Sequence, residues 1–436
     1  QQLYINNLCR YCSISTGSDS TSATRPTTIC QFDLANMLVE ELNQLNLEEV
    51  HVDDNCFVYG YFNKQNTQKR VVLLAHMDTT ETAPNQNVRP MVHEYSGGDL
   101  VLPFTVIRGY ELDVKPGQTV ITSDGSTLLG ADNKAGVAIL TTLFRALADF
   151  VTQSACISEE HEQIDNNTSE ETLYSNQLHK NKYNPSTFPS VCVCFTPDEE
   201  TGRGIHNVSL NKLTSGIQNV VALTVDGNCA HDIDVETFEG TEFIIQIEGK
   251  TDQASVCQLQ CQQEAGVPIW TSVELASALY QRMSLEFTPP WESEDNQPFV
   301  YIHKIETAGE KTVLHGIVRA FSGVAALTER VGDFVRKFGV QFEHLSQISF
   351  SSKSQYVNLK HELDERFLKQ LKQIGEKFDV QFSAIRGGTD GSALALQGLA
   401  APNVWTGSDL IHSEKEFNVV EEAMDAVQFL FDFLTQ

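Results

Sequence analysis

The run VVLLAHMDT, residues 71–79, decides the fold of this chain. Its first part, Val71 to Ala75, is continuously apolar, and a histidine follows at once. A short continuous apolar run is typical of a strand that is buried on both faces of a parallel sheet. Two further runs have the same character, Val191 to Phe195 and Val220 to Val225. Together the three runs predict a largely parallel β-sheet.

Helical patterns lie before, between and after these strands. Strands that alternate with helices of this length are typical of an α/β fold in which helices flank the sheet. The predicted helices are Phe32 to Leu47, Lys134 to Phe150, Thr271 to Leu285, Glu362 to Phe378, and Val420 to Leu434.

The chain length predicts more than one domain, because 436 residues exceed the size at which a single core usually stops growing. Residues 238–353 have strand and helix patterns of their own and predict a smaller α+β domain, inserted into a main domain formed by residues 1–237 and 354–436. Residues 152–189 are polar and lack periodicity, which predicts a mobile surface insertion in the main domain.

The composition excludes some partners. The 58 acidic and 30 basic residues give a formal net charge of −28, which would repel nucleic acid and anionic membranes. No run approaches 18 apolar residues, and the first residues lack the basic and apolar blocks of a signal peptide, so we expect neither a transmembrane helix nor export. The ten cysteines show no paired zinc-site spacing and indicate reduced thiols in the cytoplasm.

The three buried runs all end in histidine or carboxylate residues. His76 follows the first run, Glu199 and Glu200 follow the second, and Asp226 follows the third. In an open α/β sheet, ligands bind beyond the carboxyl ends of the strands, so we expect these side chains to meet in one cleft. Glu199 and Glu200 are neighbours, and on an extended chain neighbours point to opposite sides, so we expect one to face water and the other a metal.

Two later segments supply similar side chains. Asp132 lies in a loop of small residues that enters a helix near Lys134, and His412 follows another short apolar run. With the strand-end residues they make two imidazoles and three carboxylates, too many for one catalytic zinc but suited to two metals that share a carboxylate, with manganese or cobalt as substitutes. Asp78 lies on the same face of an extended chain as His76 and is placed to orient its imidazole.

At this point the motifs resemble the peptidase T family of aminotripeptidases, in the cocatalytic-zinc superfamily that also holds carboxypeptidase G, aminoacylases and desuccinylases. The resemblance runs from about residue 70 to residue 417. The motifs that carry it are His76-Met-Asp-Thr79, Gly130-Ala-Asp-Asn-Lys-Ala-Gly136, Pro197-Asp-Glu-Glu200, Thr224-Val-Asp-Gly227, Ile385-Arg-Gly-Gly-Thr-Asp-Gly391 and the late His412.

The resemblance implies a zinc-peptidase-like catalytic domain that carries an inserted lid domain, and two zinc ions. His76 and Asp226 would bind one ion. Glu200 and His412 would bind the other, and Asp132 would bridge the two.

The resemblance also implies how short peptides are cleaved at their first bond. Glu199 would be the general base for a metal-bridging water. Arg386 would contact the substrate carboxylate, and Arg319 would reach in from the lid domain. The lid would close alone or across a homodimer formed through that domain.

The chain departs from the family in the lid. The family has a lid histidine that polarises the scissile carbonyl, and here Gln253 stands at about its place. An amide can donate a hydrogen bond but carries no charge, and an oxyanion donor is typically worth roughly 10²–10³ in turnover. Three functions therefore stay open: an aminopeptidase, which we favour because Glu199 is retained; a deacylase or dipeptidase with another substrate; and a metal-bound peptide-binding scaffold with weakened turnover.

Overall fold

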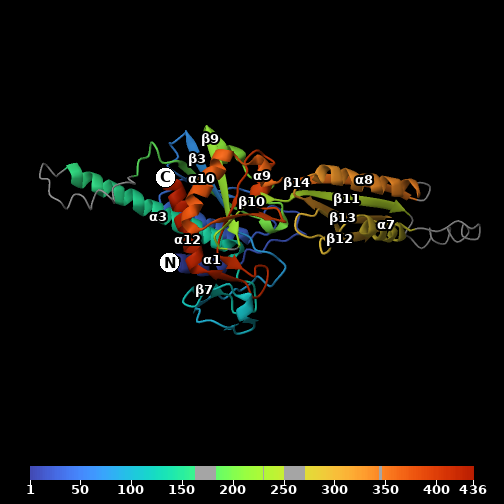
Figure 1. Ribbon diagram of the computed structural model, residues 1–436, viewed down its shortest axis with the longest axis horizontal. Coiled ribbons are helices and arrows are strands. Elements are labelled where there is room, and N and C mark those ends of the chain that lie inside the picture. Colours follow the sequence, from blue (N-terminus) through green and yellow to red (C-terminus); the bar gives the residue numbers. More distant parts are fainter. Residues whose placement is uncertain (163–182, 229, 250–270, 343–345) are drawn as a thin grey trace, which may run out of the picture. The chain divides into compact units, whose positions relative to one another are not determined.

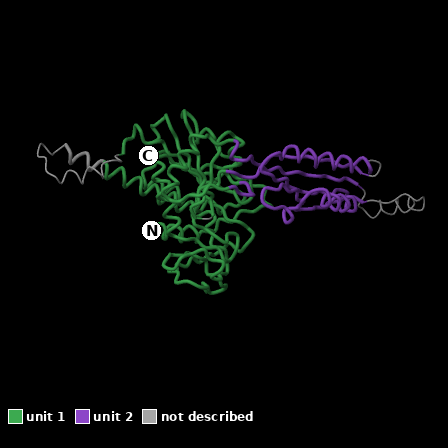
Figure 2. Tube along the Cα trace, in the orientation of Figure 1, with its two compact units in different colours: residues 1–235, 362–383, 389–436 green, residues 236–361, 384–388 purple. Residues whose placement is uncertain are grey.

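The computed structural model of the protein describes residues 1–162, 183–228, 230–249, 271–342 and 346–436. These residues form two compact units (Figure 2). The first unit comprises residues 1–235, 362–383 and 389–436, and the second comprises residues 236–361 and 384–388. The second unit extends beyond the expected end at 353 because its last strand, β14 (Ser346–Tyr356), runs on past that residue.

The first unit is built on an eight-stranded sheet in the order β1-β2-β8-β3-β9-β16-β10-β15. Three of its strands, β3, β9 and β10, are labelled in Figure 1. The neighbours β8, β3, β9 and β16 are parallel, and the pairs β1–β2, β2–β8 and β10–β16 are antiparallel. The parallel centre contains all three strands predicted from the buried runs. The strands are β1 (Glu48–Val52), β2 (Val58–Phe62), β3 (Lys69–His76), β8 (Ser190–Thr196), β9 (Asn219–Gly227), β10 (Asp232–Thr237), β15 (Gln381–Ile385) and β16 (Asn403–Trp405).

Helices cover this sheet and confirm the predicted α/β class. Helix α3 packs against β3 and β9, and both α1 and α12 pack against α3. Apolar side chains from these elements form one continuous buried core. The helices of this unit are α1 (Gln2–Cys12), α2 (Gln31–Gln44), α3 (Ala131–Glu162), α5 (Leu210–Thr214), α10 (Glu365–Gly375), α11 (Asp390–Ala395) and α12 (Val420–Thr435). Helix α9 (Leu359–Glu362) falls almost entirely in the second unit.

Helix α3 is longer than predicted. It continues to Glu162 because residues 151–162 contain no Gly or Pro that would end it. The expected insertion at 152–189 is therefore helical at its start, and residues 163–182 lie outside the described part of the chain. By length and composition alone, residues 131–154 could cross a membrane, but 61% of the apolar window is buried inside the protein, as in a core helix.

The helix predicted from Glu362 to Phe378 is shorter in the structure, where α10 begins three residues later. Asp364 lies outside helical geometry, and its carboxylate accepts hydrogen bonds from the backbone N–H groups of Arg366 and Phe367. This N-cap starts α10, which ends at Gly375 in a short 3₁₀ turn, Glu376–Phe378. Capping by an aspartate before the apolar stripe explains why the helix begins at Glu365 and not at Glu362.

A second, smaller sheet belongs to the first unit and carries the segment before His412. Its strand order is β17-β18-β7-β4, and a hairpin of β5 and β6 lies beside it in the sequence. A small apolar cluster that includes Ile107, Val120 and Phe417 supports it. The strands are β4 (Met91–Glu94), β5 (Leu100–Val101), β6 (Val106–Ile107), β7 (Thr119–Thr122), β17 (Ser408–Asp409) and β18 (Phe417–Val419).

The second unit is an antiparallel sheet with helices packed on one face. Its strands follow the order β12-β13-β11-β14, and α7 and α8 pack against the sheet. Alternation along β11 separates the faces, because Phe243 and Ile245 are buried and Ile244 between them is exposed. The remaining elements are β11 (Glu239–Gly249), β12 (Phe299–Ala308), β13 (Lys311–Ala320), α7 (Ser272–Glu286) and α8 (Val324–Val340).

Candidate metal centre

Three neighbouring parallel strands of the first unit end at the same edge of the sheet. His76 is the last residue of β3 and pairs with Thr196, the last residue of β8. Asp226 lies at the end of β9, on the other side of β3. The topology thus brings together the three segments whose polar endings the sequence singled out.

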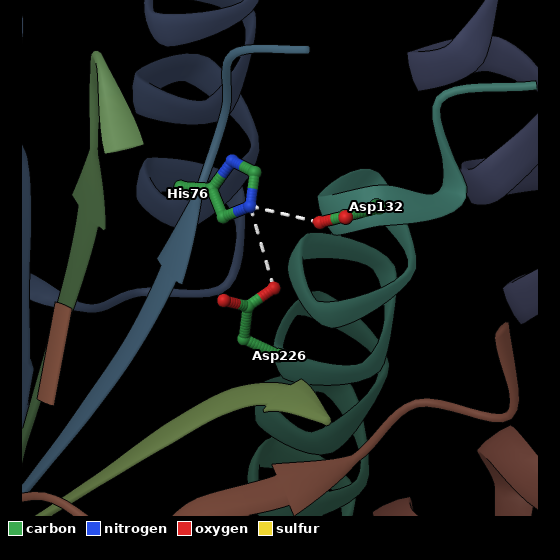
Figure 3. A group of neighbouring side chains, drawn as sticks. All are labelled: His76, Asp132 and Asp226. Carbon is green, nitrogen blue, oxygen red and sulfur yellow. Dashed lines mark hydrogen bonds and ion pairs between the residues drawn. The ribbon is translucent and has the colours of Figure 1, made fainter. Parts of the chain in front are cut away.

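Two groups of side chains at this edge have metal-binding spacing, and they share one carboxylate. His76, Asp132 and Asp226 form one group, with their ligand atoms within 4.8 Å of one another (Figure 3). Asp132, Glu200 and His412 form the other group. The structure therefore gathers all five residues predicted as metal ligands.

The shared carboxylate is that of Asp132, and its two oxygens face different histidines. Oδ1 lies 3.0 Å from Nε2 of His76, and Oδ2 lies 3.0 Å from Nε2 of His412. The other acids complete each group, with Asp226 Oδ1 at 3.3 Å from His76 Nε2 and Glu200 Oε1 at 3.1 Å from His412 Nε2. One carboxylate is thus shared by the two groups, as a ligand that bridges two metals would have to be.

Burial and close neighbours shift the pKa values of the carboxylates and histidines in this cluster. Burial raises the pKa of Glu200 to about 7 and that of Asp226 to about 7. Burial would also raise the pKa of Asp132, but hydrogen bonds from His412 and His76 hold it well below its usual value. A hydrogen bond to Asp132 and the nearby carboxylate of Glu200 raise the pKa of His412 to about 10. The crowded carboxylates thus favour positive charge in their midst.

His76 is oriented by Asp78. Nδ1 of His76 lies 3.0 Å from the backbone carbonyl oxygen of Asp78 and 3.4 Å from its carboxylate Oδ1. These acceptors place the ring proton on Nδ1 and leave Nε2 as the free ligand atom. The Asp78 carboxylate also accepts hydrogen bonds from the backbone N–H groups of Glu199, at 3.0 Å, and Glu200, at 3.2 Å. Asp78 therefore ties the histidine to the glutamate segment.

The segment that holds the adjacent glutamates is a tight turn, so our expectation of an extended chain was wrong. Glu199–Thr201 form a 3₁₀ helix that follows Asp198 in a left-handed conformation, with φ of 58°. The Asp198 carboxylate accepts hydrogen bonds from the backbone and hydroxyl of Thr27 and from the side chain of Gln31. These bonds hold the left-handed residue in place, and the backbone at the two glutamates turns instead of running as a pleated strand.

The Asp132 loop has a carboxylate anchor of its own, Glu416. This buried side chain accepts hydrogen bonds from the backbone N–H groups of Leu129, Gly130 and Asp132, at 2.8, 2.8 and 2.9 Å. Burial raises the pKa of Glu416 to about 7. Regular helical geometry of α3 begins only after Asn133, so Asp132 stands at the helix entrance with its backbone fixed from outside.

Three residues that support the site escaped the sequence analysis: Asp198, Glu416 and Asp390. Asp390 is buried, and its Oδ2 accepts a hydrogen bond of 2.7 Å from the Thr196 hydroxyl at the end of β8. Burial raises the pKa of Asp390 to about 6. Asp198 and Asp390 lie within the motifs quoted above, and Glu416 follows His412 by four residues. Only their position directly beside buried strands or turns distinguishes them from the many exposed acids.

Two of the residues predicted to bind substrate, Arg386 and Arg319, belong to the second unit and are described within it. Arg386 donates hydrogen bonds to Ser293 and lies over the ring of Phe238. Arg319 donates a hydrogen bond to Gln355. Gln253 lies outside the described residues, so its proposed role stays a prediction.

Comparisons with known proteins match this chain to peptidases. The model of peptidase family M20/M25/M40 matches residues 174–436. Peptidase T of Geobacillus kaustophilus (strain HTA426) is 29% identical over 461 residues, covering 100% of this chain and 98% of its own. Peptidase T of Bacillus subtilis (strain 168) is 28% identical over 457 residues, covering 99% of this chain and 98% of its own.

Solved structures with the same fold include two enzymes that act on peptides. A tripeptidase from Staphylococcus aureus has a TM-score of 0.67 at 16% identity and covers 100% of this chain and 97% of its own. Aminopeptidase PepT from Bacillus cereus has a TM-score of 0.63 at 17% identity and covers 100% of this chain and 98% of its own. A dinuclear metal-binding peptidase from Bacillus subtilis has a TM-score of 0.54 at 14% identity, covering 100% of this chain and 98% of its own.

Proposed function

The chain belongs to peptidase family M20/M25/M40, and we propose that it is a two-metal aminopeptidase that removes the first residue of short peptides. The observation that carries this proposal is the carboxylate of Asp132, whose two oxygens face the two histidines of two potential metal groups. The peptidase T relatives support the substrate class, since they match this chain over nearly its whole length.

The side chains present suit two divalent cations. Glu200 Oε1 is buried without a hydrogen bond, although it lies 3.1 Å from His412 Nε2, so it has room for another partner. Nitrogen and oxygen donors in this mixture suit zinc, with manganese or cobalt as substitutes. We assign His76 and Asp226 to one metal, Glu200 and His412 to the other, and Asp132 to both. Two such metals would lower the pKa of a water molecule and polarise the scissile carbonyl.

The chain's own groups would then move the proton and hold the substrate. A carboxylate oxygen of Glu199 takes a proton from the attacking water and returns it to the leaving amine nitrogen. Asp78 keeps Nε2 of His76 directed at its metal. Arg386 and Arg319 bind the carboxylate end of the peptide and position its first bond. Gln253 donates a hydrogen bond to the scissile carbonyl in place of a charged histidine.

The test is a panel of di-, tri- and tetrapeptides and an N-acyl amino acid, with metal analysis of the same sample. We expect release of the first residue from tripeptides, two metals per chain, and loss of turnover after chelation that added zinc restores. Equal turnover after chelation would refute the proposal. Cleavage of the acyl substrate alone would indicate a deacylase, and full metal content without turnover would indicate a peptide-binding scaffold.

The proposed function also suggests roles for the two units and a cellular compartment. We propose that the first unit is the catalytic domain and the second unit the lid, which closes alone or across a homodimer. Six cysteines in the described part of the chain are free thiols: Cys9, Cys12, Cys30, Cys56, Cys192 and Cys194. Free thiols support a reducing compartment, and we propose the cytoplasm.

A further inference from the structure

The guanidinium group of Arg386 is held by one residue, Ser293. Nη1 of Arg386 donates a hydrogen bond of 2.8 Å to the backbone carbonyl oxygen of Ser293, and Nη2 donates one of 2.8 Å to its hydroxyl. The guanidinium carbon also lies 5.5 Å from the centre of the Phe238 ring. Two parallel bonds and a ring face together fix the plane of the guanidinium group as well as its position.

Ser293 is built to accept these bonds. It is 8% exposed, whereas its neighbours from Trp291 to Pro298 are all exposed. Its hydroxyl donates a hydrogen bond of 2.8 Å to the carbonyl oxygen of Gln297, whose own N–H closes a turn with Glu294. A hydroxyl has one proton, so donation to Gln297 leaves its lone pairs for Arg386.

The partners of Arg386 leave its positive charge uncompensated. A serine hydroxyl, a carbonyl oxygen and a phenyl ring are all neutral, and no carboxylate in the described part of the chain forms an ion pair with Arg386. The chain has 58 acidic residues, so a surface arginine has many chances to find one. Ser293 uses two of the five guanidinium N–H groups, which leaves three for an anionic ligand.

The residue after Arg386, Gly387, borders open space. A Cβ atom at Gly387 would meet nothing within 4 Å, and the φ of Gly387 lies outside the left-handed range. Neither backbone conformation nor packing therefore demands a glycine there. The next residue is different, because a Cβ at Gly388 would lie 2.3 Å from the ring of Tyr356.

We propose that Ser293 is a positioning residue that sets the guanidinium of Arg386 to bind the free carboxylate of a short peptide. The inference rests on the proposed function, which gives Arg386 that ligand. Ser293 does not touch the substrate, and it acts by making the recognition of a carboxylate geometrically selective. A peptide amide, which is uncharged and offers one oxygen, gains little from the same arrangement.

The test compares a tripeptide with its C-terminal amide. Both carry an N-methylated first peptide bond, so that calorimetry on the metal-loaded protein measures Kd without cleavage. Ser293→Ala removes the hydroxyl acceptor and should weaken binding of the acid by roughly threefold to tenfold, the usual range for one lost hydrogen bond, with the amide unchanged. Ser293→Thr should restore the acid affinity to within about twofold, since threonine keeps the hydroxyl.

Two controls separate positioning from packing. Ser284→Ala removes a hydroxyl in the same unit that bonds only the carbonyl of Tyr280, and it should leave both affinities unchanged. If Ser293→Ala does not fold, Ser293→Cys replaces it, because a thiol keeps the size but is a weaker acceptor. Equal weakening of acid and amide, or no rescue by threonine, would overturn the proposal and leave Ser293 a packing residue.

Arg386→Ala separates this inference from the proposed function. It should abolish the preference for the acid, and Ser293→Ala should then have no further effect. If Arg386→Ala leaves the preference intact, the Ser293 proposal is wrong, even if peptides are cleaved. If the wild-type protein prefers the acid but cleaves none of the unmethylated peptides, the aminopeptidase proposal fails, and the acid-to-amide ratio in Ser293→Ala still decides the role of Ser293.

Discussion

The two compact units hold their charged side chains in opposite ways. In the first unit, the carboxylates of Asp132, Glu200 and Asp226 lie around two histidines, and each close contact pairs a carboxylate with an imidazole. In the second unit, Arg386 and Arg319 rest on neutral oxygens and aromatic rings. The metal centre accumulates negative charge, whereas each of the two arginines keeps a positive charge that no ion pair in the described part of the chain neutralises.

The difference indicates which ligands each site can accept. Carboxylates held at short range raise one another's pKa and favour a cation between them. A positive group with neutral partners keeps its charge for an anion that arrives later. The first unit therefore has the features of a centre that binds cations, and the arginines of the second unit have the features of groups that bind anions.

The strongest test of the crowded site is the pair Glu199→Gln and Glu200→Gln. We expect Glu199→Gln to keep both metals and to lose roughly 10²–10⁴-fold in kcat, the usual contribution of a general base. Glu200→Gln should lose one metal, because an amide is a poor substitute for a charged ligand. Metal content and kcat are measured on the same preparations.

Glu414→Gln is the matched control. Glu414 is exposed, two residues from His412, and the same change there should alter neither metal content nor kcat. If Glu199→Gln loses a metal, or if Glu200→Gln keeps both, the division of roles between the adjacent glutamates is wrong.

The pair also shows how far the sequence predicts such a site. The strand endings were predictable, because continuous apolar runs indicate parallel strands and topology brings their ends together. Asp198 and Glu416 were not, since their partners are Thr27 and the backbone of residues 129–132, far away along the chain. A turn that depends on a remote carboxylate leaves no local pattern, which is why the Glu199 segment was expected to be extended.

The contrast predicts a different result for Asp234, a buried carboxylate in the first unit with neutral partners. Its oxygens face the Ser383 hydroxyl at 2.9 Å and the Asn403 amide at 3.4 Å, and burial raises its pKa to about 6. Between about pH 4 and pH 6 the folded protein keeps this proton and the unfolded chain releases it, so wild-type stability falls as pH rises through that window. Asp234→Asn should therefore be more stable than wild type at pH 8, by at most about 3 kcal/mol.

Chemical unfolding at pH 8 and at pH 4.5 measures this difference. The advantage of Asp234→Asn should shrink as pH falls toward the unfolded-state pKa of about 4, and it should vanish only below that pH, where wild-type Asp234 is neutral in both states. Asp149→Asn, on an exposed position of α3, should show no such dependence. An advantage for Asp234→Asn that stays constant with pH would show that the charge of Asp234 is not the cause.

The second unit was less predictable than the first for a related reason. Its helices and strands follow from periodicity, and Thr271 caps α7 by accepting from the Glu274 N–H, a pattern visible in the sequence. The resemblance suggested Arg386, but nothing local marks Ser293 as its partner, because the two are 93 residues apart. Neutral partners are harder to foresee than charged ones, since any carbonyl or hydroxyl can serve.

The smallest effect is expected at Arg319. It tests whether an arginine whose partners are all neutral can be identified as a residue that binds an anionic ligand. Arg319 donates a hydrogen bond of 2.7 Å to Gln355 and lies 4.7 Å from the Tyr356 ring, and burial lowers its pKa. Arg319→Met should raise KM for a tripeptide by no more than about fivefold, the scale of a partly exposed ion pair. The free energy of unfolding should fall little, because Arg319 is half-buried and forms no ion pair in the described part of the chain. Arg282 has the same kinds of partner, Gln341 and the Phe338 ring, so Arg282→Met is the matched control and should leave KM unchanged. Equal changes in KM for both variants would show that neutral partners alone do not identify a ligand-binding arginine, and the contrast between the units would then rest on Arg386.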